Sequence, residues 1–317
     1  MKKNKLFKVT GIILGVVAGI AIIGSVAMGA FVTDQILYQN REKDTVAASL
    51  KQLETWEYDV DSFYSKYKGK DFVATAEDGN EAPGTYFENG SDKCVVLVHG
   101  AGGDRVCMVP LAEQYLDDGY DVIIYDQRGH GANPDEKVTF GIHELRDVKA
   151  MVEYARQDLG KDKVYVHGQS MGGQTVALYA SSVTPGTVQA ADAVICDSPV
   201  PGMELLLRLM FGDGEEGAHS AFTNYLIDTS KAYMGLVKKI KYDDGDTIKL
   251  VAKDQLPTMI IVSDKDEVCP PKYVEQVYEN VGSEKKEIMH VDSAHVEGVI
   301  DDAKGYMEGV EQFLDNL

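Results

Sequence analysis

The stretch VYVHGQSMGGQTVALYAS at residues 164–181 combines the patterns of a strand, a tight turn and a helix. It begins with an apolar run typical of a buried strand, continues with glycines on both sides of Ser170, and ends in a helix-forming segment. A G-x-S-x-G sequence between a strand and a helix predicts a strained turn that projects the serine hydroxyl from the sheet. Gly168 and Gly172 suit this turn because a Cβ at either position would collide across it. The pattern therefore predicts that Ser170 is a nucleophile.

Predicted strands and helices alternate from residue 70 to residue 317, with one interruption. This alternation predicts an α/β fold, with a mostly parallel sheet, helices on both faces, and functional residues at the carboxyl ends of the strands. We expect strands at 71–79, 84–90, 94–100, 121–126, 163–168, 192–198, 257–264 and 285–290, and helices over 142–158, 171–182, 271–280 and 295–316.

A free serine hydroxyl is a weak nucleophile and needs a base, together with a residue that orients this base. On such a sheet the expected order along the chain is Ser, then Asp or Glu, then His. Asp266 follows the next-to-last predicted strand and His295 follows the last one, so we predict that they act with Ser170 as a catalytic triad. The alternatives are Asp264 and Asp197 for the acid, and His290 for the base.

Nucleophilic attack on a carbonyl also requires two amide donors for the oxyanion that forms. One is expected from Met171, the residue after the nucleophile, and the other from the loop after the first buried strand. That loop contains HGAGG at residues 99–103, and we assign the second amide to Ala101.

About 58 residues between Ser198 and Thr258 interrupt the alternation. Insertions of this length are usually functional, and we expect the one at residues 200–256 to cover the carboxyl edge of the sheet as a helical lid. Its apolar side chains suggest a pocket for an acyl or aryl group, although packing of the lid explains at least half of them. The acidic residues Glu204, Glu215 and Glu216 would instead suit the binding of a peptide terminus. The apolar residues are Leu205, Leu206, Leu207, Leu209, Met210 and Phe211, with Met171 and Met108 as further candidates.

With these motifs the chain resembles the α/β-hydrolase superfamily, in particular its lipase, esterase and serine-aminopeptidase-like members. The resemblance covers about residues 70–317 and rests on HGAGG, YDQRGHG at 125–131, GQSMG at 168–172, SDKDEVCP with Asp266, and DSAH with His295. It implies the α/β-hydrolase fold, structural roles for Asp126 and Arg128, and no catalytic role for His130. Many members of the superfamily carry a bulky residue where this chain has Ala101.

The N-terminus contains an uncharged apolar run at residues 9–33, which is long enough to cross a bilayer as a helix. Four lysines precede it, so residues 1–8 are expected in the cytoplasm and the catalytic domain outside the cell, attached to the cell membrane by a single span. A cleaved signal peptide is the alternative, with Ala27 and Gly29 as small residues near a cleavage site. Residues 34–69 are predicted to form a helical connector, with a helix over 41–67.

The formal net charge is −20, and the part after residue 33 carries all 51 acidic residues with all but four of the 31 basic ones. Such a charge disfavours nucleic acids and other polyanions as partners. The four cysteines are irregularly spaced and predict no zinc or thioredoxin-type motif, so we expect no metal and no organic cofactor. Their disulfide state and the oligomeric state stay open. The cysteines are Cys94, Cys107, Cys196 and Cys269.

Together these features predict a membrane-anchored carboxylic ester hydrolase that acts on a small-molecule ester through an acyl-enzyme. A serine peptidase or amidase of the same fold is the closest alternative. A non-catalytic surface binding protein on a hydrolase fold is the alternative of a different class. No pattern in the sequence specifies the acyl-chain length, the preference for esters or amides, or the mobility of the lid.

Overall fold

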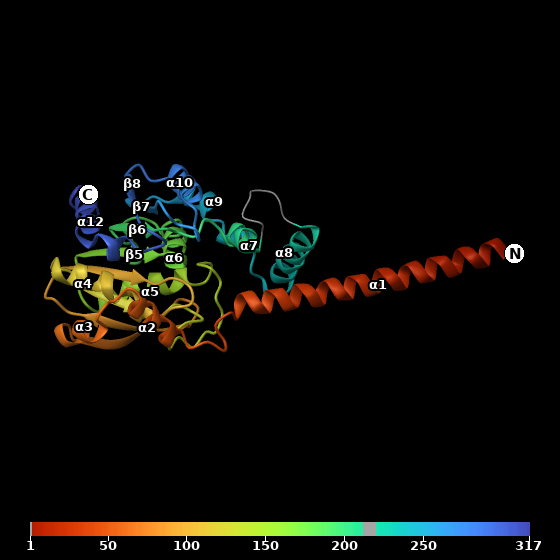
Figure 1. Ribbon diagram of the computed structural model, residues 1–317, viewed down its shortest axis with the longest axis horizontal. Helices are drawn as coiled ribbons and strands as arrows, with labels where there is room; N and C mark the ends of the chain where they lie inside the picture. The colour runs from red at the N-terminus through yellow and green to blue at the C-terminus, as the bar shows by residue number, and fades with distance from the viewer. Residues whose placement is uncertain (1, 212–219) are drawn as a thin grey trace. The chain divides into compact units, whose positions relative to one another are not determined.

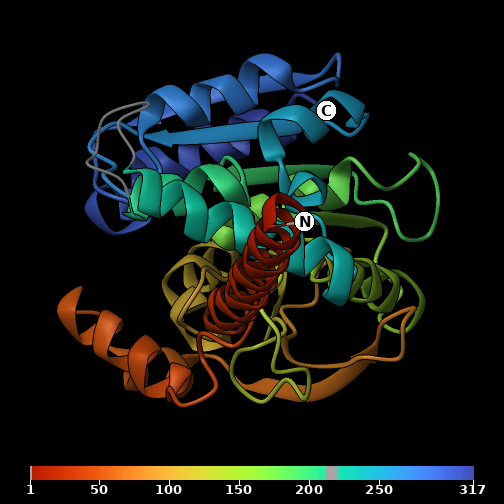
Figure 2. The same ribbon diagram turned by 90° about the vertical axis from the view of Figure 1, so that its right-hand side faces the viewer.

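The structure is a computed structural model that describes residues 2–211 and 220–317 (Figures 1 and 2). Within these residues the chain forms two compact units, one made of α1 and residues Leu207–Tyr242, the other of residues Tyr38–Leu206 and Asp243–Leu317. The strands are β1 Gly69–Thr75, β2 Glu81–Phe87, β3 Lys93–Val98, β4 Asp121–Tyr125, β5 Lys163–Gln169, β6 Ala193–Asp197, β7 Thr258–Ser263 and β8 Lys286–Val291. The α-helices are α1 Lys2–Leu37, α2 Thr45–Thr55, α3 Val60–Lys66, α4 Val109–Asp117, α5 Leu145–Gln157, α6 Met171–Ala180, α7 Met203–Phe211, α8 Ala221–Tyr233, α9 Thr247–Leu250, α10 Pro271–Asn280, α11 Gly298–Asp301 and α12 Ala303–Asp315. Short helical turns are η1 Arg105–Met108, η2 Met234–Lys238, η3 Tyr242–Gly245 and η4 Val251–Lys253.

The larger unit is built on a sheet with the strand order β1-β2-β4-β3-β5-β6-β7-β8. The pairs β1–β2 and β2–β4 are antiparallel, and every other pair is parallel. The predicted α/β fold with a mostly parallel sheet is therefore confirmed. The antiparallel edge arises because β1 and β2 form a hairpin around the turn at residues 76–80, and a tight turn reverses the chain direction.

Helices cover both faces of this sheet (Figure 1). Successive residues of a strand point to opposite faces, so the fully buried strand β3 contributes to two layers. Val95 and Leu97 pack in a buried cluster with residues of α4 and α12, such as Leu111 and Phe313. Helices α5, α6 and α10 pack against the sheet from the other side. Because the central strands are buried on both faces, the side chains at their carboxyl ends are held in place.

The connector contains two helices where one was predicted over 41–67. Helix α2 ends before Trp56, and α3 begins after Asp59, whose carboxylate accepts a hydrogen bond from the Ser62 amide. Between them Glu57 has a φ of 55°, which a continuous helix does not allow. The predicted helix over 295–316 is likewise wrong at its start, because α11 and α12 are separated at Asp302, whose side chain caps α12.

The smaller unit contains α1, which provides the stretch Phe7–Leu37, long and apolar enough to cross a membrane. Within this unit α8 lies beside the C-terminal part of α1 (Figures 1 and 2). The hydroxyls of Thr33 and Ser230 lie 3.1 Å apart, and the Tyr225 hydroxyl donates a hydrogen bond to Ser25 Oγ at 2.9 Å. A Cβ at Gly29 would overlap the backbone of Thr229, so a glycine is required for this approach.

The insertion, expected to be helical, forms α7, α8, η2, η3, α9 and η4 within the described residues. Leu206 and Leu207 are buried, whereas Met210 and Phe211 are exposed. Glu215 and Glu216, predicted with Glu204 to suit a peptide terminus, lie outside the described residues.

Candidate active site

Ser170 lies in the turn between β5 and α6 with φ 57° and ψ −119°. This conformation is unfavourable for a residue with a Cβ. Neighbouring backbone holds it, because the Ser170 amide donates a hydrogen bond to the Asp197 carbonyl at 2.9 Å. A Cβ at Gly168 would overlap the Gly172 carbonyl, and a Cβ at Gly172 would overlap the Val98 carbonyl. The close packing around this turn explains the two glycines.

His295 connects Ser170 to Asp266. Its Nε2 lies 2.8 Å from Ser170 Oγ, and its Nδ1 lies 2.6 Å from Asp266 Oδ2. The other oxygen of Asp266 accepts hydrogen bonds at 2.8 Å from the amides of Val268 and Cys269. Asp266 is buried and thus fixed in the turn after β7. The arrangement orients the ring so that Nδ1–H donates to Asp266 and Nε2 accepts from the serine hydroxyl.

The alternative acids and the alternative base lie elsewhere. Asp264 Oδ1 is 2.7 Å from His290 Nδ1 in an exposed pair. Asp197 is buried and accepts hydrogen bonds from Gln169 Nε2 at 3.1 Å and from the Tyr306 hydroxyl at 2.9 Å. Burial raises the pKa of the Asp197 carboxyl. Within the described residues, His295 is hydrogen-bonded to Asp266 and Ser170 and to neither alternative acid.

His167 is buried and contributes to a polar chain that the sequence did not reveal. Its Nδ1 lies 2.9 Å from the Tyr115 hydroxyl and its Nε2 3.0 Å from the Tyr306 hydroxyl. Tyr306 then donates to Asp197, so the chain ends beneath the turn that carries Ser170. Burial lowers the pKa of His167 to about 3, and the ring is therefore neutral at neutral pH. These contacts join four distant segments, and sequence spacing carries no signal for them.

The loop with HGAGG approaches Ser170 closely. A Cβ at Gly100 would lie 3.2 Å from Ser170 Cβ. Ala101 is exposed in this loop, and Met171 is the buried first residue of α6. In the part of the chain that the structure describes, the amides of Ala101 and Met171 have no hydrogen-bond acceptor. The oxyanion role of these two amides stays a prediction.

Two neutral histidines hold this loop. His99 Nε2 accepts a hydrogen bond from the Gln127 amide at 3.0 Å, and His130 Nε2 accepts one from the Gly102 amide at 3.0 Å. Burial lowers the pKa of His99 to about 4 and that of His130 to about 3, so each ring nitrogen stays free to accept.

Asp126 and Arg128 lie in the turn that contains His130. Asp126 accepts hydrogen bonds from the amides of Arg105 and Ala132 at 3.0 and 2.9 Å. Arg128 is buried and forms ion pairs with Asp78 and Asp147 at 2.7 and 2.8 Å. All of these contacts brace loops, in agreement with the structural roles that the resemblance implies.

One group of side chains has the composition of a cation site. Donor atoms of Asp266, Cys269 and His295 lie within 4.8 Å of one another. However, Asp266 and His295 already hydrogen-bond to each other, and burial raises the pKa of the Cys269 thiol, which keeps it protonated. A metal ion would need the thiolate and the imidazole nitrogen that these interactions occupy. All four cysteines are free thiols in this structure.

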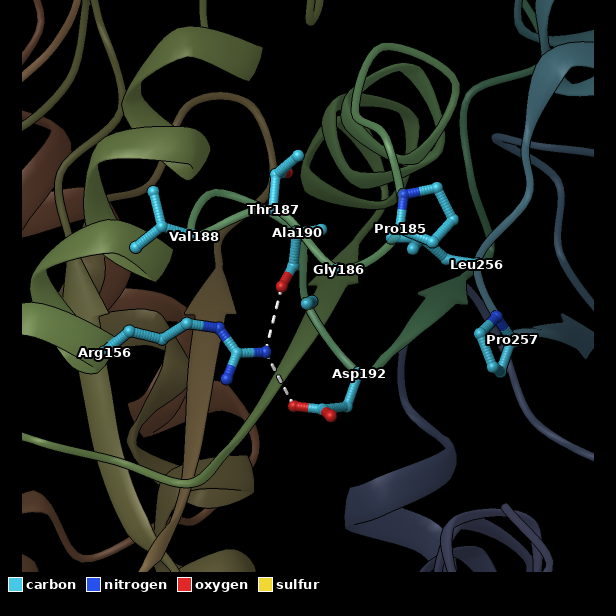
Figure 3. Close-up of a pocket in the computed structure, with 10 residues that line it drawn as sticks. Arg156, Pro185, Gly186, Thr187, Val188, Ala190, Asp192, Leu256 and Pro257 are labelled. Carbon is cyan, nitrogen blue, oxygen red and sulfur yellow. Dashed lines mark hydrogen bonds and ion pairs between the residues drawn. The ribbon is translucent and has the colours of Figure 1, made fainter.

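A separate pocket of about 590 Å³ lies at the end of the sheet away from Ser170, where the strands begin (Figure 3). In it Arg156 faces Pro185, Leu256 and Pro257, and its guanidinium donates hydrogen bonds to the Ala190 carbonyl at 2.9 Å and to Asp192 at 2.8 Å. Asp192 precedes β6 and Pro257 precedes β7, so this pocket lies at the amino ends of strands whose carboxyl ends carry the site. It is therefore distinct from the site around Ser170.

Known proteins resemble the chain over most of its length. Residues 93–232 match the family model described as the alpha/beta hydrolase fold. The thermostable monoacylglycerol lipase of Bacillus sp. (strain H-257) is 30% identical over 230 residues, covering 67% of this chain and 85% of that protein. The uncharacterized protein YqkD of Bacillus subtilis is 21% identical over 307 residues, covering 94% of this chain and 96% of that protein.

Among solved structures, the esterase Pf2001 of Pyrococcus furiosus superposes with a TM-score of 0.64 at 22% identity, covering 82% of this chain and 95% of that one. The chain thus belongs to the α/β-hydrolase family. The family and these relatives support a hydrolase.

Proposed function

We propose that the protein is a membrane-anchored serine hydrolase that cleaves carboxylic esters through Ser170, His295 and Asp266. The observation that carries the proposal is the position of His295 between the other two residues. Its Nε2 lies 2.8 Å from Ser170 Oγ, and its Nδ1 lies 2.6 Å from Asp266 Oδ2. A nucleophile, a base and an orienting acid at these distances are what acyl transfer requires.

In the first half of the reaction Ser170 Oγ attacks the ester carbonyl while His295 Nε2 takes the hydroxyl proton. Asp266 stabilises the imidazolium that forms. The negative charge on the former carbonyl oxygen is stabilised by the amides of Ala101 and Met171. Met171 is the first residue of α6, so the positive end of the helix dipole adds to this stabilisation. The intermediate collapses when His295 returns the proton to the leaving alcohol, and the acyl group stays on Ser170.

In the second half a water molecule attacks the acyl-enzyme. His295 removes one proton from the water and delivers it to Ser170 Oγ as the acyl bond breaks. The carboxylic acid leaves, and the enzyme is restored. Proton transfer through one histidine accounts for both halves, and the proposal assigns no step to a metal or an organic cofactor.

A small-molecule ester is the proposed substrate, because the similar proteins include a monoacylglycerol lipase and an esterase. The test is a panel of 4-nitrophenyl esters and amino-acid 4-nitroanilides, with the full chain and with Ser170→Ala. Ester hydrolysis that disappears in Ser170→Ala supports the proposal, and preferential anilide hydrolysis would instead identify a peptidase or amidase. Hydrolysis of neither class would favour a binding protein on a hydrolase fold.

Membrane attachment through α1 is part of the proposal, with residues 9–33 as the span, 1–8 in the cytoplasm and the hydrolase domain of residues 70–317 outside the cell. The apolar length of α1 supports this assignment. The contacts of Ser25 and Gly29 with α8 favour a retained anchor over a cleaved signal peptide, since cleavage after Gly29 would remove both residues. Residues 34–69 remain the proposed connector, and the insertion at 200–256 the proposed lid.

A further inference from the structure

Polar side chains of the connector reach the loops around Ser170. Asn40, Thr45 and Ser49 are 6%, 5% and 0% exposed, and each is hydrogen-bonded to backbone outside the connector. A buried hydroxyl or N–H group lowers stability unless it finds a partner, and Thr45 Oγ1, Ser49 Oγ and Asn40 Nδ2 find theirs in two loops near Ser170. All three lie outside the part of the chain that the family model matches.

Ser49 contacts the C-terminal end of the loop that contains Ala101. The Asp104 amide donates a hydrogen bond to Ser49 Oγ at 2.8 Å. A Cβ at Gly103 would lie 3.1 Å from the same oxygen, so the loop packs directly on α2. Burial raises the pKa of the neighbouring Asp104 to about 6, and the hydrogen bond with Ser49 opposes that shift.

Thr45 and Asn40 contact the same loop indirectly. The Gly131 amide donates to Thr45 Oγ1 at 2.8 Å, and Asn40 Nδ2 donates to the Gly129 carbonyl at 3.1 Å. These bonds hold the turn between Gly129 and Gly131, in which His130 accepts the hydrogen bond from the Gly102 amide. The connector is thus linked to the loop at Gly102 and at Asp104.

The N-terminal side of the loop is held by hydrogen bonds from residues of the hydrolase domain and not from the connector. Gln127 Nε2 donates to the His99 carbonyl at 2.6 Å, and His99 Nδ1 lies 2.7 Å from the Gly100 carbonyl. The backbone of Ala101 lies between these contacts and those that begin at Gly102. Oxyanion stabilisation requires a donor whose position is set before the reaction, because small displacements weaken it strongly.

We propose that Thr45 and Ser49 are positioning residues that hold the amide of Ala101 in place for the oxyanion, Ser49 through Asp104 and Thr45 through the turn with His130. The inference rests on the proposed function. It gives the segment that follows the membrane helix an indirect part in catalysis, because neither hydroxyl touches the substrate. Loss of either hydroxyl lowers the rate of acyl transfer while substrate binding in the ground state changes little.

The test uses the full chain in detergent micelles, with 4-nitrophenyl butyrate as substrate and a fluorophosphonate to titrate active sites. Ser49→Ala and Thr45→Val remove the hydroxyls, whereas Thr45→Ser keeps one. Thr55→Val is the matched control on the same helix, because the exposed Thr55 hydroxyl donates to the Lys51 carbonyl within α2 and has no other partner among residues 2–211 and 220–317. Inhibition by an alkyl trifluoromethyl ketone, which forms a hemiketal oxyanion on serine, reports oxyanion binding directly.

We expect Ser49→Ala and Thr45→Val to lower kcat per titrated site about tenfold, less than the ~10²–10³-fold loss of an oxyanion donor itself. KM should stay within about twofold and the trifluoromethyl ketone should bind about tenfold more weakly. Thr45→Ser and Thr55→Val should match the parent.

Unchanged kcat per titrated site in Ser49→Ala and Thr45→Val would overturn the inference, as would an equal loss in Thr45→Ser and Thr45→Val, which would point to packing. If Ser49→Ala does not fold, the Thr45 pair alone decides. Failure of the proposed function has a different signature, since the parent would then show no hydrolysis that depends on Ser170.

Discussion

His295 Nε2 lies 2.8 Å from Ser170 Oγ, although 125 positions separate the two residues in the chain. The contact arises because β5 and β8 run parallel in one sheet, so the loops that follow them meet at the same edge. A serine in a strained turn after β5 and a histidine after β8 are thereby brought into hydrogen-bonding distance.

Asp266 is expected to be the residue that orients His295. Asp266→Asn removes the negative charge and favours the wrong ring tautomer, so kcat should fall on the order of 10³-fold or more. Asp264→Asn is the matched control two residues away, and it should stay near the parent because Asp264 pairs with His290 in an exposed position. Steady-state kinetics on an ester decides, and a larger loss in Asp264→Asn or Asp197→Asn would reassign the acid.

The backbone conformation of Ser170 should appear as a cost in stability. A residue with a Cβ is disfavoured at φ 57° and ψ −119°. The free energy of unfolding of Ser170→Gly should therefore be about 1 kcal/mol larger than that of Ser170→Ala. Both variants lack the hydroxyl, which isolates the backbone effect. Ala48→Gly on the exposed side of α2 serves as control and should destabilise by about 1 kcal/mol. Urea unfolding measures each difference, and a less stable Ser170→Gly would contradict the strained turn.

Stability should fall in acid partly because His167 is buried in its neutral form. Its pKa is about 3 in the fold against 6.5 as the ordinary value, so between these pH values the unfolded chain binds the extra proton. The contribution of neutral His167 to the free energy of unfolding is therefore fully present above about pH 6.5 and is lost as the pH falls. From pH 7 to pH 5 the parent should lose about 2 kcal/mol more than His167→Gln. Urea titrations at both pH values test this, and equal losses would mean that His167 is protonated in the fold.

Gly29 is expected to be required for the pairing of α1 with α8. A leucine there would collide with the backbone of Thr229, whereas Gly24 has open space around it. Thr33→Cys with Ser230→Cys should form a disulfide on oxidation, because the two native hydroxyls are 3.1 Å apart. Adding Gly29→Leu should reduce this cross-link several-fold, and adding Gly24→Leu should leave it unchanged. Equal cross-linking in both backgrounds would show that the pairing does not need the glycine.

The strands were predictable because each central strand is a continuous apolar run, and burial on both faces requires such a run. Ser170, Asp266 and His295 could be expected at one edge of the sheet because the carboxyl ends of parallel strands meet there, and their order along the chain is the one expected for this fold. Helix ends were less predictable. The split between α2 and α3 depends on Asp59 as a cap and on the left-handed Glu57, and both are local choices that helical periodicity does not show.

Other contacts between distant segments were not predictable. The hydrogen bonds of Ser49 with Asp104 and of His167 with Tyr115 and Tyr306 depend on how whole elements pack. A serine within a helix and a histidine within a strand read the same in sequence whether or not such partners exist. These contacts are nevertheless the ones that hold the loops around Ser170.

The central claim is that Ser170 is an activated nucleophile, and labelling with a fluorophosphonate probe tests it most directly. An activated serine displaces fluoride and keeps the phosphonyl group, which mass spectrometry then locates in the full chain. We expect an adduct on Ser170 in the parent and in His290→Ala, and none in His295→Ala. A folded parent that takes up no label at Ser170, or a His295→Ala variant that is labelled as fast as the parent, would contradict the account.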